Sequence, residues 1–119
     1  MELDLYTRIL DLGEENRAHA EHMREAGYKA ARYDRDYKML RAKKEIELRA
    51  LGHPASMVKD LAEGDEEVSL AKLQSNLAEA DADSDKEIIN NNKKIMDTLK
   101  SQMEFERVGR NMTEGFYEY

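Results

Sequence analysis

Apolar residues in the first part of the chain recur at the spacing of a coiled coil. Alternating steps of four and three residues from Leu5 reach eleven positions, nine of which are apolar or aromatic. A mean spacing of 3.5 residues held over five repeats is typical of a helix that packs along a partner helix. We therefore expect a long first helix with one continuous contact seam. The seam positions are Leu5, Ile9, Leu12, Asn16, His19, Met23, Ala26, Ala30, Tyr33, Tyr37 and Leu40.

A second stripe with the same spacing follows in the latter part of the chain and predicts a second long helix. Most of its positions are apolar, and Ser84 and Asn91 are polar exceptions. No segment shows the period-two alternation of a strand, so the fold class is all-α. The expected positions are Leu70, Leu73, Leu77, Ala80, Ser84, Ile88, Asn91, Ile95, Leu99, Met103 and Glu106.

Between the two stripes lies a corner that contains the only proline of the chain. Gly52 suits the left-handed position that ends a helix, and Pro54 prevents its continuation. Pro54 as first residue or Ser56 as N-cap can begin a short helix that Gly64 ends. Asp65 is a suitable N-cap for the second long helix. We expect the corner to cover the hairpin end with Met57, Val58 and Leu61, and to expose Lys59 and Glu63.

These elements predict an antiparallel hairpin of two long helices with a short helix at the turn. The expected arms are residues 3–51 and 65–108, joined by a corner at 52–64 and followed by a flexible tail at 109–119. If the arms meet symmetrically about the corner, facing residue numbers sum to about 116. Tyr37 then lies opposite alanines near residue 80. Because each arm buries only one stripe, we expect a homo-oligomer, with a dimer in a four-helix bundle favoured.

Charge and composition limit the function classes. Charged residues make up 38% of the chain and the net charge is −7, which disfavours general binding to nucleic acid. The chain has no cysteine, an acidic N-terminus and no long apolar run, so we expect a cytoplasmic protein without a membrane segment. No nucleophile with its base, phosphate loop or cofactor fingerprint is visible, so we expect no enzyme, no cofactor and no metal.

Two motifs resemble metal sites but favour other roles. The run HAEH places His19 and His22 one turn apart, yet His19 falls on the seam, where a hydrogen-bonded polar residue is commoner than a ligand. The run EADADSDKE spaces three aspartates like an EF-hand loop, but Lys86 replaces the required glycine and Asn92 the closing glutamate. A solvated acidic surface is the favoured interpretation.

Three groups of residues are candidates for contacts with other molecules. Polar seam residues can fix helix register or oligomeric state, as a buried asparagine does in coiled coils; these are Asn16, His19 and Asn91. Candidate partner-binding residues lie in the corner and the tail: Lys59, Glu63, Phe116, Tyr117 and Tyr119. A basic run is a candidate nucleic-acid contact, although pairing with acids one turn away is favoured; it contains Lys38, Arg41, Lys43, Lys44 and Arg49.

The run LRALGHPASMVKDLAEGDEEV resembles a segment of small helical proteins encoded by phages and prophages of Gram-positive bacteria. The resemblance covers roughly residues 48–77 and brings no established activity with it. It implies a viral accessory role in the cytoplasm of the host bacterium. The first hypothesis is a non-catalytic interaction module that binds or inhibits a host protein. The alternatives are an accessory factor in phage DNA replication or recombination, and an acidic inhibitor that mimics nucleic acid.

Overall fold

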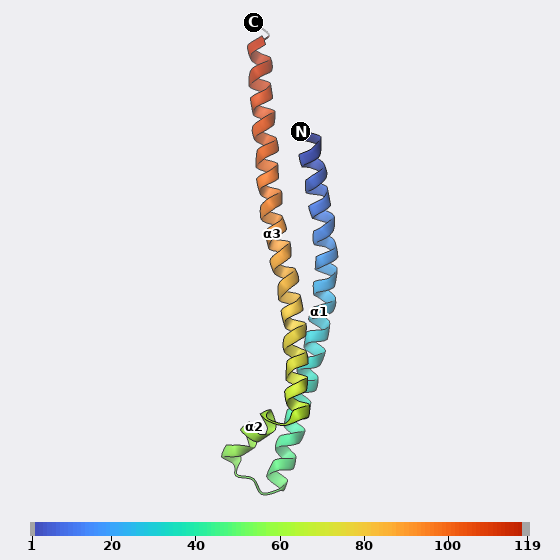
Figure 1. The fold of residues 1–119 in the computed structure, drawn as a ribbon, viewed down its shortest axis with the longest axis vertical. Helices are drawn as coiled ribbons and strands as arrows, with labels where there is room; N and C mark the ends of the chain where they lie inside the picture. Colours follow the sequence, from blue (N-terminus) through green and yellow to red (C-terminus); the bar gives the residue numbers. More distant parts are fainter. Residues whose placement is uncertain (1, 118–119) are drawn as a thin grey trace. The chain divides into compact units, whose positions relative to one another are not determined.

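The computed structural model describes the backbone of residues 2–117 and the side chains of residues 3–112. It contains three helices, which are α1 (Glu2–Ala50), α2 (Ala55–Glu63) and α3 (Glu66–Tyr117) (Figure 1). The described residues contain no strand, so the all-α class and the short helix between two long ones are confirmed. The chain divides into two compact units, and each is described by itself. Unit 1 comprises Met1–Glu21 with Asp85–Tyr119, and unit 2 comprises His22–Ser84.

In unit 1 the start of α1 packs antiparallel against the second half of α3. Asn16 contacts Ile89 and Asn92, and the earlier Gly13 faces the later Met96. Leu99 is buried in this contact. The first-arm seam is confirmed here and in unit 2, because all eleven of its positions are buried or half-buried.

In unit 2 the rest of α1 packs against both other helices. One buried cluster joins Tyr37 of α1 to Val68 and Ala71 of α3, with Leu40 packed against it. A second cluster joins Leu48 near the end of α1 to the inner face of α2. That face consists of Val58 and Ala62, whose exposed fractions are 1% and 0%.

The turn into α2 follows the sequence expectation in most respects. Gly52 adopts a φ of 91°, which only glycine enters without strain, and the amide of His53 bonds the carbonyl of Leu48 at 3.2 Å. Pro54 occupies the N-cap position with extended backbone, so neither Pro54 as first residue nor Ser56 as cap describes the start of α2. Asp65 caps α3 as expected, since its carboxylate accepts the amide of Val68 at 3.3 Å.

The expected register of the hairpin is wrong. Residue numbers in contact add up to 104 for His19 and Asp85 and to 109 for Lys44 and Asp65, well below 116. The cause is α2, which folds back and packs on Leu48. The last two turns of α1 therefore pack against α2 instead of α3, and α3 begins opposite Lys44.

The expected seam of the second arm is also wrong in unit 2. Leu70, Leu73 and Leu77 are exposed, and the positions that are buried instead are Val68, Ala71, Ser75 and Ala78. Small side chains fit here because the facing α1 contributes the bulky ring of Tyr37. In unit 1 the expected seam is wrong at Asn91 and Ile95, which are exposed, and Asn92 is buried instead; it is confirmed at the other expected positions there, which are buried or half-buried: Ile88, Leu99, Met103 and Glu106.

Two further expectations are wrong at the ends of elements. Met57 and Leu61 are exposed, because α2 turns Val58 and Ala62 toward α1. The second long helix was expected to end near residue 108, but α3 continues through Gly109 to Tyr117.

Candidate protein-interaction surfaces

A polar cluster lies within the α1–α3 contact of unit 1. Nδ2 of Asn92 donates to Oδ1 of Asn16 at 2.9 Å, and Nδ2 of Asn16 donates to the carbonyl of Ile89 at 3.3 Å. One turn away, Nδ1 of His19 lies 2.9 Å from Oδ1 of Asp85, whose exposed fraction is 5%. Asn16 and His19 thus act as the polar seam residues that the sequence predicts. Their partners, Asp85 and Asn92, were missed because the register of α3 was misplaced.

This arrangement also shows where the metal-like motifs lie. Asp85 points into the α1–α3 contact and bonds His19, while Asp81 and Asp83 are exposed. Nε2 of His19 lies 3.8 Å from Glu15, one turn earlier on the same helix. Among the described residues, no three histidine, aspartate or glutamate side chains meet in a group that could hold a metal ion.

A second polar network ties all three helices together in unit 2. The hydroxyl of Tyr37 in α1 donates to Oε1 of Glu63 at the end of α2, at 2.5 Å. Arg41 donates to the same Glu63 oxygen at 3.4 Å and lies over the Tyr37 ring. Lys72 of α3 lies 3.6 Å from the other oxygen of Glu63. Glu63 is therefore a structural anchor, and the expectation that it points to solvent is wrong.

The charges of this network favour the ionised form of Glu63. The hydroxyl of Tyr37, and then Arg41 and Lys72, lower the pKa of Glu63 below its ordinary value, although partial burial acts in the opposite direction. Contacts with Tyr37 and then with Glu63 raise the pKa of Arg41, although partial burial acts in the opposite direction. Sequence spacing alone gives no signal for this network, because it depends on how α2 folds back.

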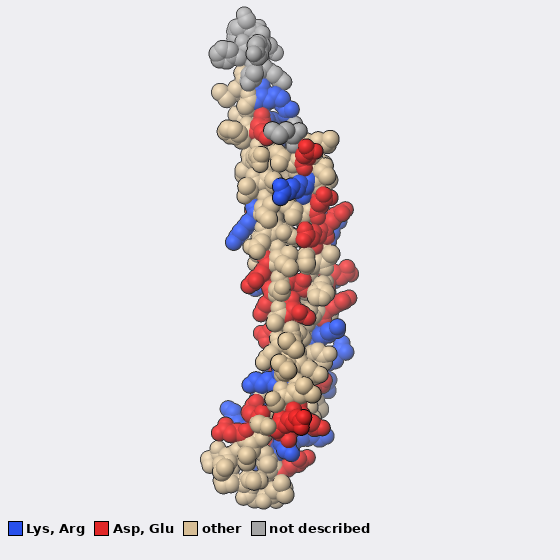
Figure 2. Space-filling model, in the orientation of Figure 1, with Lys and Arg blue, Asp and Glu red and all other residues tan. Residues whose placement is uncertain are grey.

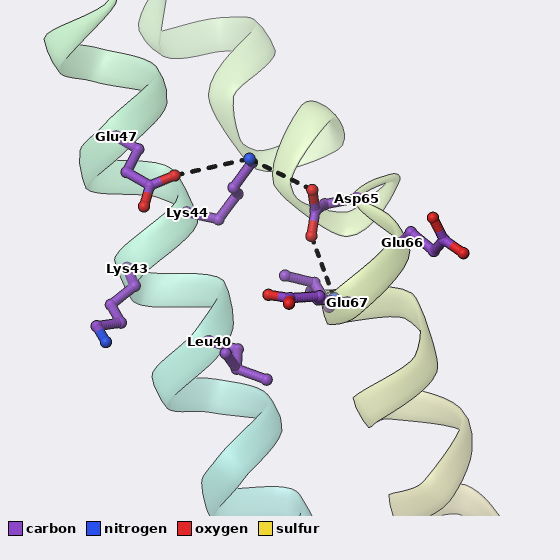
Figure 3. A pocket seen from close by; sticks show the side chains of 8 residues that line it. Leu40, Lys43, Lys44, Glu47, Asp65, Glu66 and Glu67 are labelled. Carbon is purple, nitrogen blue, oxygen red and sulfur yellow. Dashed lines mark hydrogen bonds and ion pairs between the residues drawn. The ribbon is translucent and has the colours of Figure 1, made fainter.

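A groove of about 410 Å³ lies between α1 and the start of α3 in unit 2 (Figure 3). Lys44 points across it and pairs with Asp65 at 3.3 Å and with Glu47 at 3.6 Å. Asp65, and then Glu47, raise the pKa of Lys44. Partial burial alone would raise the pKa of Asp65, but the amide of Val68 and the ammonium of Lys44 lower it. The side chains that point across the groove thus neutralise one another and cap α3.

The basic run of α1 does not form one uniform face. Lys38 pairs with Asp34 at 2.9 Å, Arg41 belongs to the Glu63 network, and Lys44 pairs across the groove. Lys43 and Arg49 are exposed. Three of the five candidate nucleic-acid contacts thus lie beside carboxylates of this chain, which reduces the positive potential that a phosphate would meet.

The corner presents a surface with few charges. Residues 50–58 contain no lysine, arginine or acid, and the surface formed by α2 and the end of α1 is largely uncharged on the face seen in Figure 2. Leu51, Met57 and Leu61 are exposed here, and Lys59 is an exposed charge beside them. Lys59 is exposed, as the sequence predicts.

The outer side of α3 in unit 2 carries an unusual stripe. Leu70, Leu73 and Leu77 have exposed fractions of 56%, 52% and 59%, while the buried side of the same helix holds mainly small residues. Their spacing of three and four continues through Ala80 to Ser84, which are also exposed. We name these five residues the outer stripe. The sequence predicts the spacing of this stripe, but the prediction that its leucines face α1 is wrong.

The tail residues Phe116, Tyr117 and Tyr119 lie outside the residues whose side chains are described. In the part of the chain that is described, no helix is both long and apolar enough to cross a membrane.

Comparison with protein-family models, with curated proteins and with solved structures finds no match for this chain.

Proposed function

We propose that this protein is a non-catalytic, self-associating helical module that acts by binding another protein. The observation behind the proposal is the placement of its large apolar side chains. In unit 2 the leucines of α3 and the large apolar residues Met57 and Leu61 of the corner are exposed, while the residues that α2 and α3 bury are alanine, serine and valine. Exposed apolar residues that form contiguous patches mark interaction surfaces.

The corner is the surface that we assign to the protein partner. Met57 and Leu61 lie one turn apart on α2 and are exposed, as are Leu51 after the end of α1 and the charged Lys59. Interfaces commonly combine an apolar centre with a polar rim. Glu63, the other candidate from the sequence, holds α2 to α1 and α3 and so supports this patch indirectly.

The biological setting rests on the resemblance of residues 48–77 to small phage-encoded helical proteins. The resembling segment coincides with the corner and the start of α3. An accessory protein that binds and inhibits a host protein through this corner fits both features. Self-association into a four-helix assembly would cover the outer stripe and leave the corner accessible.

Affinity capture from a lysate of a Gram-positive host tests the proposal. The wild type is compared with Met57→Glu and Leu61→Glu, which place charge in the corner patch, and with Leu10→Glu in unit 1 as a matched control. We expect a specific host protein to be captured by the wild type and by the control, and to be lost in both corner variants while helicity is unchanged. Capture that is unaffected by the corner variants contradicts the assigned surface. Binding to DNA that weakens steeply with salt would replace the proposal by a nucleic-acid function.

A further inference from the structure

The outer stripe lies in the least charged part of α3. Residues 68–78 contain a single charged side chain, Lys72, in a chain that is 38% charged. Lys72 is engaged with Glu63 and lies 5.8 Å from the centre of the Tyr37 ring, so it belongs to the contacts within the chain. The outer stripe is thus apolar and free of unpaired charge at its centre, and acidic residues flank it only toward its two ends.

The outer stripe has the form of a second helix-packing seam. Steps of three and four connect Leu70, Leu73, Leu77, Ala80 and Ser84, the a and d spacing of a heptad. The buried positions of α3, from Val68 to Ala78, follow the same spacing two residues out of step. Because α1 occupies the other side of α3, the outer stripe is available to a helix from outside this chain.

We propose that a second copy of this chain covers the outer stripe, with the two α3 helices antiparallel about a two-fold axis near Ser75. This inference rests on the proposed self-association and specifies its interface. A two-fold axis at this point places Leu73 opposite Leu77 of the partner subunit. It also places Leu70 opposite Ala80 of the partner subunit. Two leucine layers at the centre, flanked by large-against-small layers, match the requirement for close packing.

The charge pattern is the reason for choosing a second copy rather than an unrelated helix. Near a two-fold axis every side chain meets its own copy, so a charge there repels itself. The residues that flank the centre of the outer stripe are Gln74 and Asn76. Their amides both donate and accept hydrogen bonds, so they are compatible with their own copies. In a chain this rich in charge, an uncharged centre favours self-pairing.

The same geometry limits the strength of the dimer. The pairing helices overlap over residues 66–84, which is about 28 Å at 1.5 Å per residue. An interface of this length belongs to the small, weak class, so we expect dissociation in the micromolar range. At each end Glu67 approaches Asp81 of the partner subunit. Because these are like charges, added salt should strengthen the dimer by screening them.

Sedimentation velocity over a concentration series tests the interface. The variant is Leu73→Lys, and the matched control is Leu10→Lys in unit 1, because both leucines have an exposed fraction of 52%. We expect the wild type and Leu10→Lys to dimerise alike, and Leu73→Lys to weaken dimerisation at least tenfold with its circular dichroism unchanged. A wild type that stays monomeric at several hundred micromolar overturns the proposal. Equal weakening by both variants also overturns it.

Thiol crosslinking tests the antiparallel arrangement, because the chain contains no cysteine of its own. Ser69→Cys and Asp83→Cys are both exposed positions that the two-fold axis brings together between subunits. With a short bismaleimide, a mixture of the two variants should crosslink strongly, and each variant alone should not. Parallel helices would give the reverse result and overturn the inference. Host-protein capture through Met57 and Leu61 is a separate readout, so a monomer that still captures its partner refutes the dimer alone.

Discussion

Leu48 and Leu51 are three residues apart, and the structure predicts that the same substitution has different effects at the two positions. Leu48 is 8% exposed and packs against Val58 and Ala62, while Leu51 is 76% exposed. Truncation of Leu48 to alanine removes about three methylene equivalents from the contact, at roughly 0.8 kcal/mol each. The residual cavity adds to this loss, although α2 is short and can move toward it. We therefore expect Leu48→Ala to cost about 2.5–3.5 kcal/mol.

Leu51→Ala is the matched control, and we expect it to change the free energy of unfolding by less than about 0.5 kcal/mol. Urea unfolding followed by circular dichroism, at one fixed protein concentration, measures both variants. Hydrogen exchange in α2 gives a local readout, because loss of Leu48 should release α2 before α1 and α3 separate. Equal losses for the two variants would refute the packing of α2 on α1. An increase in α2 exchange for Leu51→Ala alone would refute it as well.

Two further predictions concern the polar networks. Because its contacts lower the pKa of Glu63, the ionised form stabilises the fold above the ordinary value of about 4.5, and this contribution is lost as the pH falls through the lowered pKa. Glu63→Gln should therefore lower the unfolding midpoint at pH 7 and match the wild type near pH 2; a difference that persists unchanged at pH 2 would contradict this role. Asn92→Ala should cost about 1–2 kcal/mol because it removes the donor to Asn16 from a buried contact, while Asn91→Ala should cost less than about 0.5 kcal/mol. Equal midpoints for these two variants would contradict the register of unit 1.

The first helix was predictable because its pattern is unambiguous. Its seam holds one spacing from Leu5 to Leu40, and the corner has strong local signals in Gly52 and Asp65. These features depend on residues close together in the chain, so propensity and capping rules determine them. The polar seam residues Asn16 and His19 were identified for the same reason. Their partners were not, since Asp85 and Asn92 depend on how the two helices are aligned.

The alignment could not be predicted because it depends on the path of α2. A corner that only reverses the chain gives one register, while a corner whose helix packs on Leu48 gives another, about two turns away. Both registers satisfy the spacing rules. The sequence contains one signal that separates them: Val68, Ala71, Ser75 and Ala78 are small and match the bulky tyrosines of α1. The leucine stripe is more apolar and has the same heptad spacing, so it hides this signal in the sequence.

The misassigned leucines are themselves informative about function. In unit 2 the largest apolar residues of α3 point away from α1, so this part of α3 has two seams, and only one of them is buried in the described fold. Three leucines at heptad spacing lose favourable burial when they face water, at about 25 cal/mol per Å² of apolar surface. Covering them gains that energy only if the new neighbour is also a helix with complementary spacing. The outer stripe of a second copy meets this condition without a further component, and the corner, which lies outside the paired residues 66–84, stays available for a different protein.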